Sequence, residues 1–166
     1  VGESVREPLK YFENNTSKLV RLLSFCKEQK INRFIFSSTA AVYGQPKDQM
    51  VSEEVEKRPI NPYGFSKLQA EQTIQNFAHA HPDFRYAILR YFNVAGAMPD
   101  GSIGQATPNA THLIKVACEK AAGVREQVKI FGTDYETPDG TCIRDYIHVL
   151  DLVDAHIAAL NELEHK

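Results

Sequence analysis

Tyr63 and Lys67 are four residues apart in the sequence Asn61-Pro-Tyr-Gly-Phe-Ser-Lys67. Proline is favoured in the first turn of a helix, and residues four apart on a helix share one face, with Cβ atoms about 6 Å apart. A free phenol ionises near pH 10, so it acts as a base at neutral pH only when a neighbouring charge stabilises the phenolate. One cation about 4 Å away contributes about 4 kcal/mol at an effective dielectric near 20. The pair therefore predicts a tyrosine base activated by lysine.

The spacing alone is weak evidence for catalysis. With 7 tyrosines and 11 lysines in 166 residues, about half a Tyr-x-x-x-Lys match is expected by chance. The alternative is an ordinary tyrosine and lysine on a solvated helix face. The secondary-structure elements expected around the pair distinguish a catalytic pair from two solvated side chains.

The elements on either side of the pair predict a parallel α/β unit. The apolar run 33–38 is typical of a buried parallel strand, a helix is expected over 63–79, and a second buried strand is expected over 84–91. Such a strand, helix and strand predict a right-handed parallel crossover. Ligands bind beyond the carboxyl ends of parallel strands, where Thr39 follows the first strand. Thr39 could donate a hydrogen bond to a substrate oxygen, or it could be a plain turn threonine.

A long helix is expected before the first strand, over residues 4–30, with Pro8 in its first turn. The cluster Asn14-Asn15-Thr16 interrupts it with weak helix formers, which suggests either a polar contact or a bland exposed patch. The second half of the chain predicts a helix over 111–122, strands over 128–131 and 144–149, and a last helix capped by Asp151. Gly96, Gly101 and Gly104 do not have the spacing of a dinucleotide fingerprint.

Composition narrows the classes of function. The chain is 43% hydrophobic with a net charge of −2, so it has no basic face for nucleic acid and no cationic amphipathic helix for a membrane surface. No apolar run has the length of a membrane span. The 3 cysteines are far apart in sequence and the 6 histidines lack metal-ligand spacing, which indicates a reducing, cytoplasmic setting and no metal site.

Four stretches together resemble the UDP-glucose 4-epimerase family of extended short-chain dehydrogenases/reductases. They are Thr39-Ala-Ala-Val-Tyr-Gly44 after a Phe-Ile-Phe-Ser-Ser strand, Pro62-Tyr-Gly-Phe-Ser-Lys67, Arg90-Tyr-Phe-Asn-Val-Ala-Gly96, and Ile130-Phe-Gly-Thr-Asp-Tyr135 continued by Asp139-Gly-Thr-Cys-Ile-Arg-Asp-Tyr-Ile-His-Val149. The first three stretches are shared with other nucleotide-sugar enzymes. The last stretch points to the epimerases.

The resemblance implies the later half of a Rossmann-like, doubly wound parallel sheet plus the start of a small α/β substrate domain. Residues 1–96 would belong to the NAD-binding domain, 97–145 to the UDP-sugar domain, and 146–166 to a return strand and helix. The chain begins at Val1 and opens on a helix, and the glycine-rich first strand-turn-helix of the family is not in it. An internal fragment with little or no activity by itself is therefore expected.

The resemblance also implies reversible inversion at C4 of UDP-glucose and UDP-galactose with tightly held NAD, through a 4-keto sugar. Tyr63 would take the proton of the 4-hydroxyl, Lys67 would stabilise the phenolate and hydrogen-bond the nicotinamide ribose, and Thr39 would bridge the sugar hydroxyl and Tyr63. The positions that match cofactor contacts are Asn14, Tyr63, Lys67 and Phe92. The positions that match substrate contacts are Thr39, Asn93, His112, Leu113, Lys129, Ile130, Phe131 and Arg144, of which His112 stands where the family often has Asn.

Three alternatives to this activity are considered. A nucleotide-sugar 4,6-dehydratase uses the same Tyr and Lys but needs an acid and a base beside the hydroxyl residue, where this chain has Ala40 and Ala41. An N-acetylhexosamine epimerase is not separated from a glucose epimerase by these motifs. A non-catalytic module is the third alternative, because helices 8–29 and 63–79 resemble those of the family's homodimer interface.

Overall fold

The computed structural model describes residues 2–46 and 50–165. The residues up to Tyr91 together with those from His156 onward form one compact unit, and Phe92–Ala155 forms a second. The elements of the first unit are α1 (Gly2–Arg6), α2 (Pro8–Phe12), the π-helix η1 (Glu13–Ser17), α3 (Lys18–Glu28), β1 (Arg33–Thr39), the 3-10 helix η2 (Ala40–Tyr43), α4 (Pro62–Ala80), β2 (Arg85–Tyr91) and most of α6 (Val149–His165). Those of the second unit are β3 (Asn93–Ala95), α5 (Leu113–Ala121), β4 (Tyr146–His148) and the start of α6.

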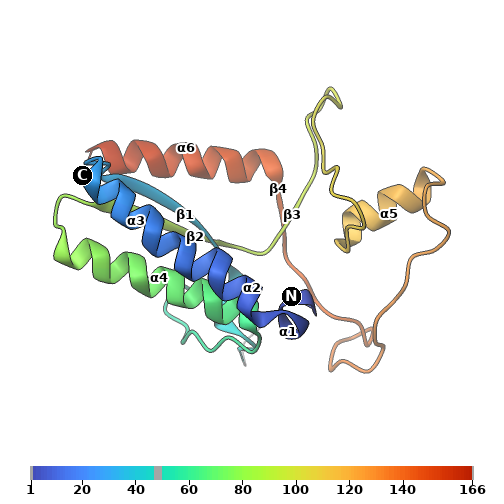
Figure 1. Ribbon diagram of the computed structural model, residues 1–166. Helices are drawn as coiled ribbons and strands as arrows, with labels where there is room; N and C mark the ends of the chain where they lie inside the picture. The colour runs from blue at the N-terminus through green and yellow to red at the C-terminus, as the bar shows by residue number, and fades with distance from the viewer. Residues whose placement is uncertain (1, 47–49, 166) are drawn as a thin grey trace. The chain divides into compact units, whose positions relative to one another are not determined.

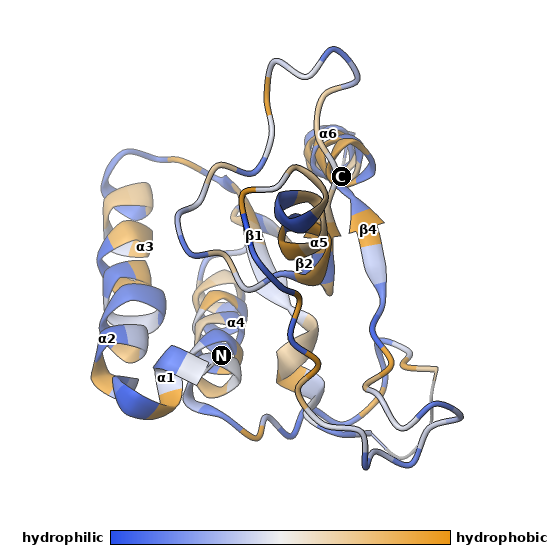
Figure 2. Ribbon diagram, turned by 90° about the vertical axis from the view of Figure 1, so that its right-hand side faces the viewer, coloured by the Kyte–Doolittle hydropathy of each residue, from blue (hydrophilic) through white to orange (hydrophobic). Residues whose placement is uncertain are grey.

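The centre of the first unit is a pair of parallel strands. β1 and β2 pair in parallel from Arg33 opposite Arg85 to Thr39 opposite Tyr91, and α4 connects them along the chain. Helices α3 and α4 lie on one side of the strands and α6 lies on the other (Figures 1 and 2). The predicted α/β class and the parallel pairing of the two strands are confirmed.

The core of this unit lies between the strands, α3 and α4. Apolar side chains recur at helical spacing in both helices, so each helix presents an apolar stripe to the other and to the strands. Burying one such side chain contributes about 1.5–3 kcal/mol. The buried members are Leu19, Leu23, Cys26, Ala70, Ile74 and Phe84, and Phe34, Phe36, Phe77 and Tyr86 pack against them.

The prediction of one continuous helix over 4–30 is wrong, because the helix is interrupted at Glu7. Glu7 has a non-helical backbone (φ −126°, ψ 61°) and separates α1 from α2. The cause is Pro8, whose ring disfavours the helical conformation at the preceding residue while Pro8 itself starts α2. The polar cluster at 14–16 lies in the π-helix η1, which is continuous with α2 and α3.

The second unit contains a short parallel pair, β3 with β4, in which Val94 lies opposite Ile147. The helix predicted over 111–122 is confirmed as α5, and the strand predicted over 144–149 is confirmed over its middle residues. The strand predicted over 128–131 is wrong, because this segment has no regular secondary structure and pairs with no described strand. Asp151 lies in the first turn of α6 and does not cap it, since the helix begins at Val149.

No helix in the described ranges combines the length and apolar character needed to cross a membrane. Within the same ranges, His, Cys, Asp and Glu side chains do not gather in groups of three or more that could hold a metal ion.

Candidate active site

The first turn of α4 is fixed by its own sequence. Asn61 has an extended backbone, and its side-chain Oδ1 accepts a hydrogen bond from the backbone N–H of Gly64 at 2.9 Å. This is the arrangement of an N-cap, which satisfies a donor that the helix leaves without a partner. Pro62 occupies the first helical position, so Tyr63 and Lys67 fall in the first two turns of α4.

The start of α4 lies directly on η2, the element that follows Thr39. A Cβ atom at Gly64 would stand 2.6 Å from the carbonyl oxygen of Ala41 and 2.9 Å from the Cβ of Pro59. Only glycine therefore allows this approach. The contact places the turn that carries Tyr63 against the residues at the carboxyl end of β1.

Lys67 is bound at the end of the same strand. Its Nζ donates a hydrogen bond to the backbone carbonyl of Ser37 at 2.9 Å and lies 4.7 Å from the centre of the Phe36 ring. Burial lowers the pKa of Lys67 below its ordinary value, and the negative charge of Glu71 opposes this effect. An ammonium group has three N–H donors, so Lys67 can donate to a ligand while keeping its bond to Ser37.

Thr39 is buried at the end of β1. Its Oγ1 accepts a hydrogen bond from the backbone N–H of Ala41 at 3.2 Å and so caps η2. The alternative in which Thr39 is a turn threonine is therefore correct for its contact with η2. A hydroxyl that accepts one hydrogen bond still has a proton to donate, so capping η2 is compatible with binding a substrate oxygen.

The ring of Tyr63 is packed edge-on against Tyr11 of α2. The two ring centroids are 5.9 Å apart and the planes make an angle of 79°, an arrangement that aromatic pairs favour. The hydroxyl of Tyr11 donates to Oε2 of Glu3 at 2.7 Å, and this bond raises the pKa of Tyr11. Tyr63 itself is half-buried.

The π-helix η1 clamps α4 between Tyr63 and Lys67. Asn15 donates through Nδ2 to Oγ of Ser66 at 2.9 Å, and the hydroxyl of Thr16 donates to the carbonyl of Ser66 at 3.1 Å. The Ser66 hydroxyl in turn donates to the carbonyl of Tyr63 at 2.8 Å. The polar interruption thus makes a polar contact, and π-helical turns are frequent at functional sites. Sequence reasoning missed Ser66, for which that interruption was the only signal.

We predict that Ser66→Ala destabilises the chain. Ser66 is fully buried, and the substitution leaves the Nδ2 donor of Asn15 without its partner, which costs about 1–3 kcal/mol. The free energy of unfolding, measured with urea, should fall by that amount. Ser24→Ala is the matched control, because the exposed Ser24 hydroxyl bonds only the carbonyl of Val20 in its own helix. An equal effect of the two substitutions would contradict the clamp.

Asn14, the cofactor candidate on η1, is exposed. Its Nδ2 donates to the carbonyl of Lys10 at 2.6 Å, and its Oδ1 accepts from Nζ of Lys18 at 2.6 Å. The π-helical turn therefore directs Asn14 away from the contact that Asn15 and Thr16 make with Ser66.

The remaining candidates belong to the second unit. Asn93 donates through Nδ2 to the carbonyl of Asp145 at 2.9 Å, which supports the pairing of β3 with β4. Arg144 is exposed and bonds only the carbonyl of its neighbour Ile143 in the described contacts. The other members of this group, all exposed, are Phe92, His112, Leu113, Lys129, Ile130 and Phe131.

His112 stands at the N-terminus of α5 and makes no side-chain cap. It lines a cavity of about 440 Å³ within the second unit. The cavity is mainly apolar, and its other lining residues include Val94, Ala95, Met98, Ile103, Leu150 and Val153. Of the predicted substrate contacts, the structure thus places His112 at a cavity.

The chain is similar to known proteins over nearly its whole length. The chain is 58% identical over 163 residues to UDP-glucose 4-epimerase of Azospirillum brasilense, covering 98% of this chain and 47% of that protein. A crystal structure of UDP-glucose 4-epimerase from Brucella ovis in complex with NAD matches with a TM-score of 0.94 at 47% identity, over 99% of this chain and 50% of that one. The UDP-Glc/GlcNAc 4-epimerase of Campylobacter jejuni matches with a TM-score of 0.80 at 54% identity, over 100% of this chain and 50% of that one.

This chain spans about half the length of the curated relatives that it matches. The family model of the NAD dependent epimerase/dehydratase family matches residues 1–166. The match extends over the described elements that carry Thr39, Tyr63 and Lys67, and the chain therefore belongs to the NAD dependent epimerase/dehydratase family.

Proposed function

We propose that this chain carries the proton-transfer machinery of an NAD-dependent UDP-glucose 4-epimerase. One observation supports this most: the ammonium group of Lys67 is held at the carboxyl end of β1, one turn after Tyr63 on the same helix and next to the strand end that carries Thr39. A tyrosine and lysine on a solvated helix face would not show this burial or this bond.

The steps assigned to the chain's own residues are a proton transfer and its stabilisation. Tyr63 takes the proton of the sugar 4-hydroxyl while a hydride leaves C4, so that a 4-keto sugar results, and it returns the proton after the sugar has presented its other face. The ammonium group of Lys67 stabilises the phenolate form of Tyr63. Thr39 donates a hydrogen bond to the sugar oxygen. When bound, NAD supplies the acceptor for the hydrogen that leaves C4 and its donor for the reverse step.

Lys67 and Asn14 have hydrogen-bonding groups that suit a dinucleotide cofactor. Lys67 has N–H donors beyond the one that binds Ser37, and it lies where ligands of parallel sheets bind. We assign ribose binding to Lys67 and Tyr63, with further cofactor contacts from Asn14 and Phe92. The exposed amide of Asn14 bonds only its own helical stretch in the described contacts, so it can exchange these bonds for a ligand at little cost.

We assign contacts with the UDP-sugar to the substrate positions expected from the sequence. Thr39 contacts the sugar, and Arg144 offers a planar guanidinium that suits a diphosphate. The other assigned contacts are Asn93, His112, Leu113, Lys129, Ile130 and Phe131. In domain terms we assign 1–96 to the cofactor, 97–145 to the UDP-sugar, and 146–166 to the return to the cofactor domain.

The sibling dehydration is disfavoured by Ala40 and Ala41, which offer no acid or base after Thr39. One similar protein is a UDP-Glc/GlcNAc 4-epimerase, so N-acetylated UDP-sugars are candidate substrates as well. Both UDP-galactose and UDP-N-acetylgalactosamine should therefore be assayed. We expect the reaction in the cytoplasm.

The decisive test uses a chimera in which this chain replaces the matching segment of the Azospirillum brasilense relative. We expect the chimera to convert UDP-galactose to UDP-glucose, and the 166-residue chain alone, with NAD added, to show no turnover. An inactive but folded chimera that binds NAD would overturn the proposed activity. Robust turnover by the isolated chain would overturn the expected dependence on a further cofactor-binding segment.

The non-catalytic alternative is association through the helices at 8–29 and 63–79, which include α3 and α4. A groove of about 660 Å³ lies between these helices, lined by Val20, Leu23, Thr73 and Phe77 among others, and Leu22 and Phe25 of α3 are exposed. We propose a homodimer through this face in addition to catalysis. Native mass spectrometry with and without NAD separates a chain that binds the cofactor from one that only dimerises.

A further inference from the structure

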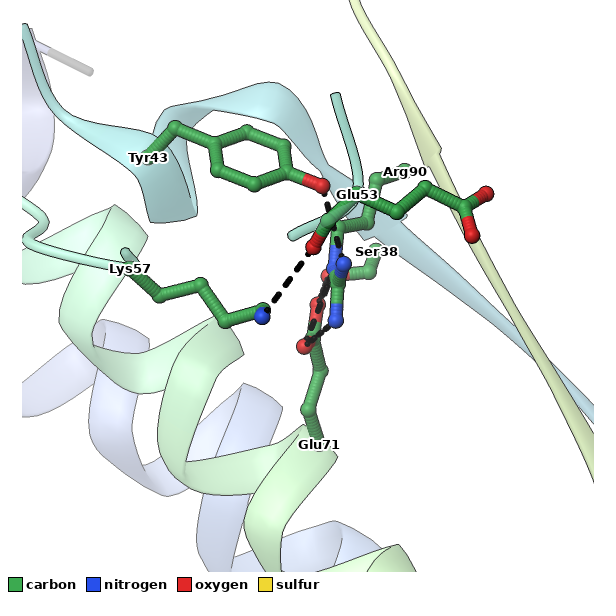
Figure 3. Close-up of polar contacts among 6 residues, drawn as sticks. All are labelled: Ser38, Tyr43, Glu53, Lys57, Glu71 and Arg90. Atoms are coloured by element: carbon green, nitrogen blue, oxygen red, sulfur yellow. Dashed lines mark hydrogen bonds and ion pairs between the residues drawn. The ribbon is translucent and has the colours of Figure 1, made fainter. Parts of the chain in front are cut away.

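Glu71 is a buried carboxylate one helical turn after Lys67 on α4, and only 1% of its surface is exposed. The hydroxyl of Ser38 donates to its Oε1. Arg90 donates through Nε to Oε1 at 3.0 Å and through Nη2 to Oε2 at 2.8 Å. Figure 3 shows the carboxylate facing both partners. Glu71 thus ties α4 to two strands at once.

The two partners are neighbours across the sheet, because Ser38 of β1 lies opposite Arg90 of β2. Arg90 extends the network with a bond from Nη1 to the hydroxyl of Tyr43 at 2.9 Å (Figure 3). Its bonds to Glu71 raise the pKa of Arg90 above its ordinary value, so the guanidinium stays charged. The network therefore joins α4, β1, β2 and η2, the elements that carry or adjoin Thr39, Tyr63 and Lys67.

Stability alone does not explain a buried ion pair at this place. Removing two charges from water is costly, and replacing such a pair by apolar side chains of similar volume is often neutral or stabilising. The ion pair does fix the orientation of α4 relative to the strands, because charge-assisted hydrogen bonds of a guanidinium to a carboxylate require a fixed geometry. Apolar packing would leave α4 freer to slide along the ends of the strands.

We infer that Glu71 is a positioning residue. Through its bonds to Ser38 and Arg90 it fixes where α4 lies along the strands, and with it the positions of Tyr63 and Lys67 relative to the end of β1. This inference rests on the proposed function. The same carboxylate provides the negative charge that offsets the effect of burial on the pKa of Lys67. A displacement of about 1 Å at reacting groups can reduce the rate about 100-fold, so loss of the network should lower kcat and leave KM nearly unchanged.

The test replaces the whole network by apolar side chains in the chimera, with Ser38→Ala, Tyr43→Phe, Glu71→Leu and Arg90→Met combined. This combination leaves no polar partner orphaned, so the fold should persist. We expect kcat for UDP-galactose to fall about 10- to 100-fold with KM changed less than about threefold. The control is Arg33→Gln with Glu164→Gln, a 2.7 Å ion pair that joins the other end of β1 to α6, for which no change is expected.

A second readout does not depend on activity. In the 166-residue chain, the rate at which acetic anhydride modifies Lys67, measured by mass spectrometry relative to Lys57, should rise at least about threefold in the fourfold variant. Unchanged kcat together with unchanged Lys67 reactivity in a folded variant would overturn the inference. If the unmodified chimera is inactive, the proposed function fails and the Lys67 reactivity alone decides the role of Glu71. Should the fourfold variant not fold, Glu71→Gln takes its place, with an expected fall in kcat of about fivefold.

Discussion

Tyr63→Phe in the chimera is expected to reduce kcat for UDP-galactose by about 10³-fold, because it removes the group that accepts and returns the proton of the sugar hydroxyl. General acid–base catalysis by one side chain contributes about 10²- to 10⁴-fold. The ring that packs against Tyr11 is kept, so the free energy of unfolding should change by less than about 1 kcal/mol. The measurements are kcat at saturating UDP-galactose and urea unfolding.

Tyr11→Phe is the matched control for this prediction. It removes a hydroxyl from the neighbouring ring, whose described hydrogen bond goes to the exposed Glu3 and not to α4. We expect kcat to stay within about threefold of the unmodified chimera, because no proton transfer is lost. If the two substitutions had similar effects on kcat, Tyr63 would not be the base.

Lys67→Met is expected to reduce kcat at pH 7 by about 10²- to 10³-fold. The lost cation contributes about 4 kcal/mol to a phenolate about 4 Å away at an effective dielectric near 20. In the variant, the remaining rate should rise as the pH approaches 10, where a free phenol ionises. The measurement is kcat from pH 6 to 10 in the variant and in the unmodified chimera.

The sign of the pH effect in the unmodified chimera follows from the burial of Lys67. Burial lowers the pKa of Lys67, so the ammonium group is lost as the pH rises through a value below the ordinary 10.5. The activation of Tyr63 should decline over the same range. Lys57→Met is the control, since Nζ of Lys57 also donates to a backbone carbonyl, that of Glu53, but at an exposed position. A pH profile of Lys67→Met parallel to that of the control would exclude the assigned role.

Local signals in the sequence were sufficient for the elements that carry the candidate site. The Asn61 cap, the helix-starting Pro62 and the four-residue spacing lie within one stretch of α4, so α4 and the shared face of Tyr63 and Lys67 could be predicted. The apolar runs of β1 and β2 likewise predicted a parallel pair. The segment at 128–131 does not form the predicted strand, because a strand requires a pairing partner and apolar composition does not supply one.

The sequence by itself determined the identity and spacing of the reactive groups, since spacing along one helix fixes which side chains share a face. Only the tertiary structure decided what holds them: Ser37 accepting from Lys67, Asn15 and Thr16 clamping Ser66, and Glu71 joining Ser38 and Arg90. These partners are 19 to 51 residues apart in the chain. No local periodicity predicts such contacts, because they form only when α4, η1 and the strands pack together and the buried polar groups must find partners in one another.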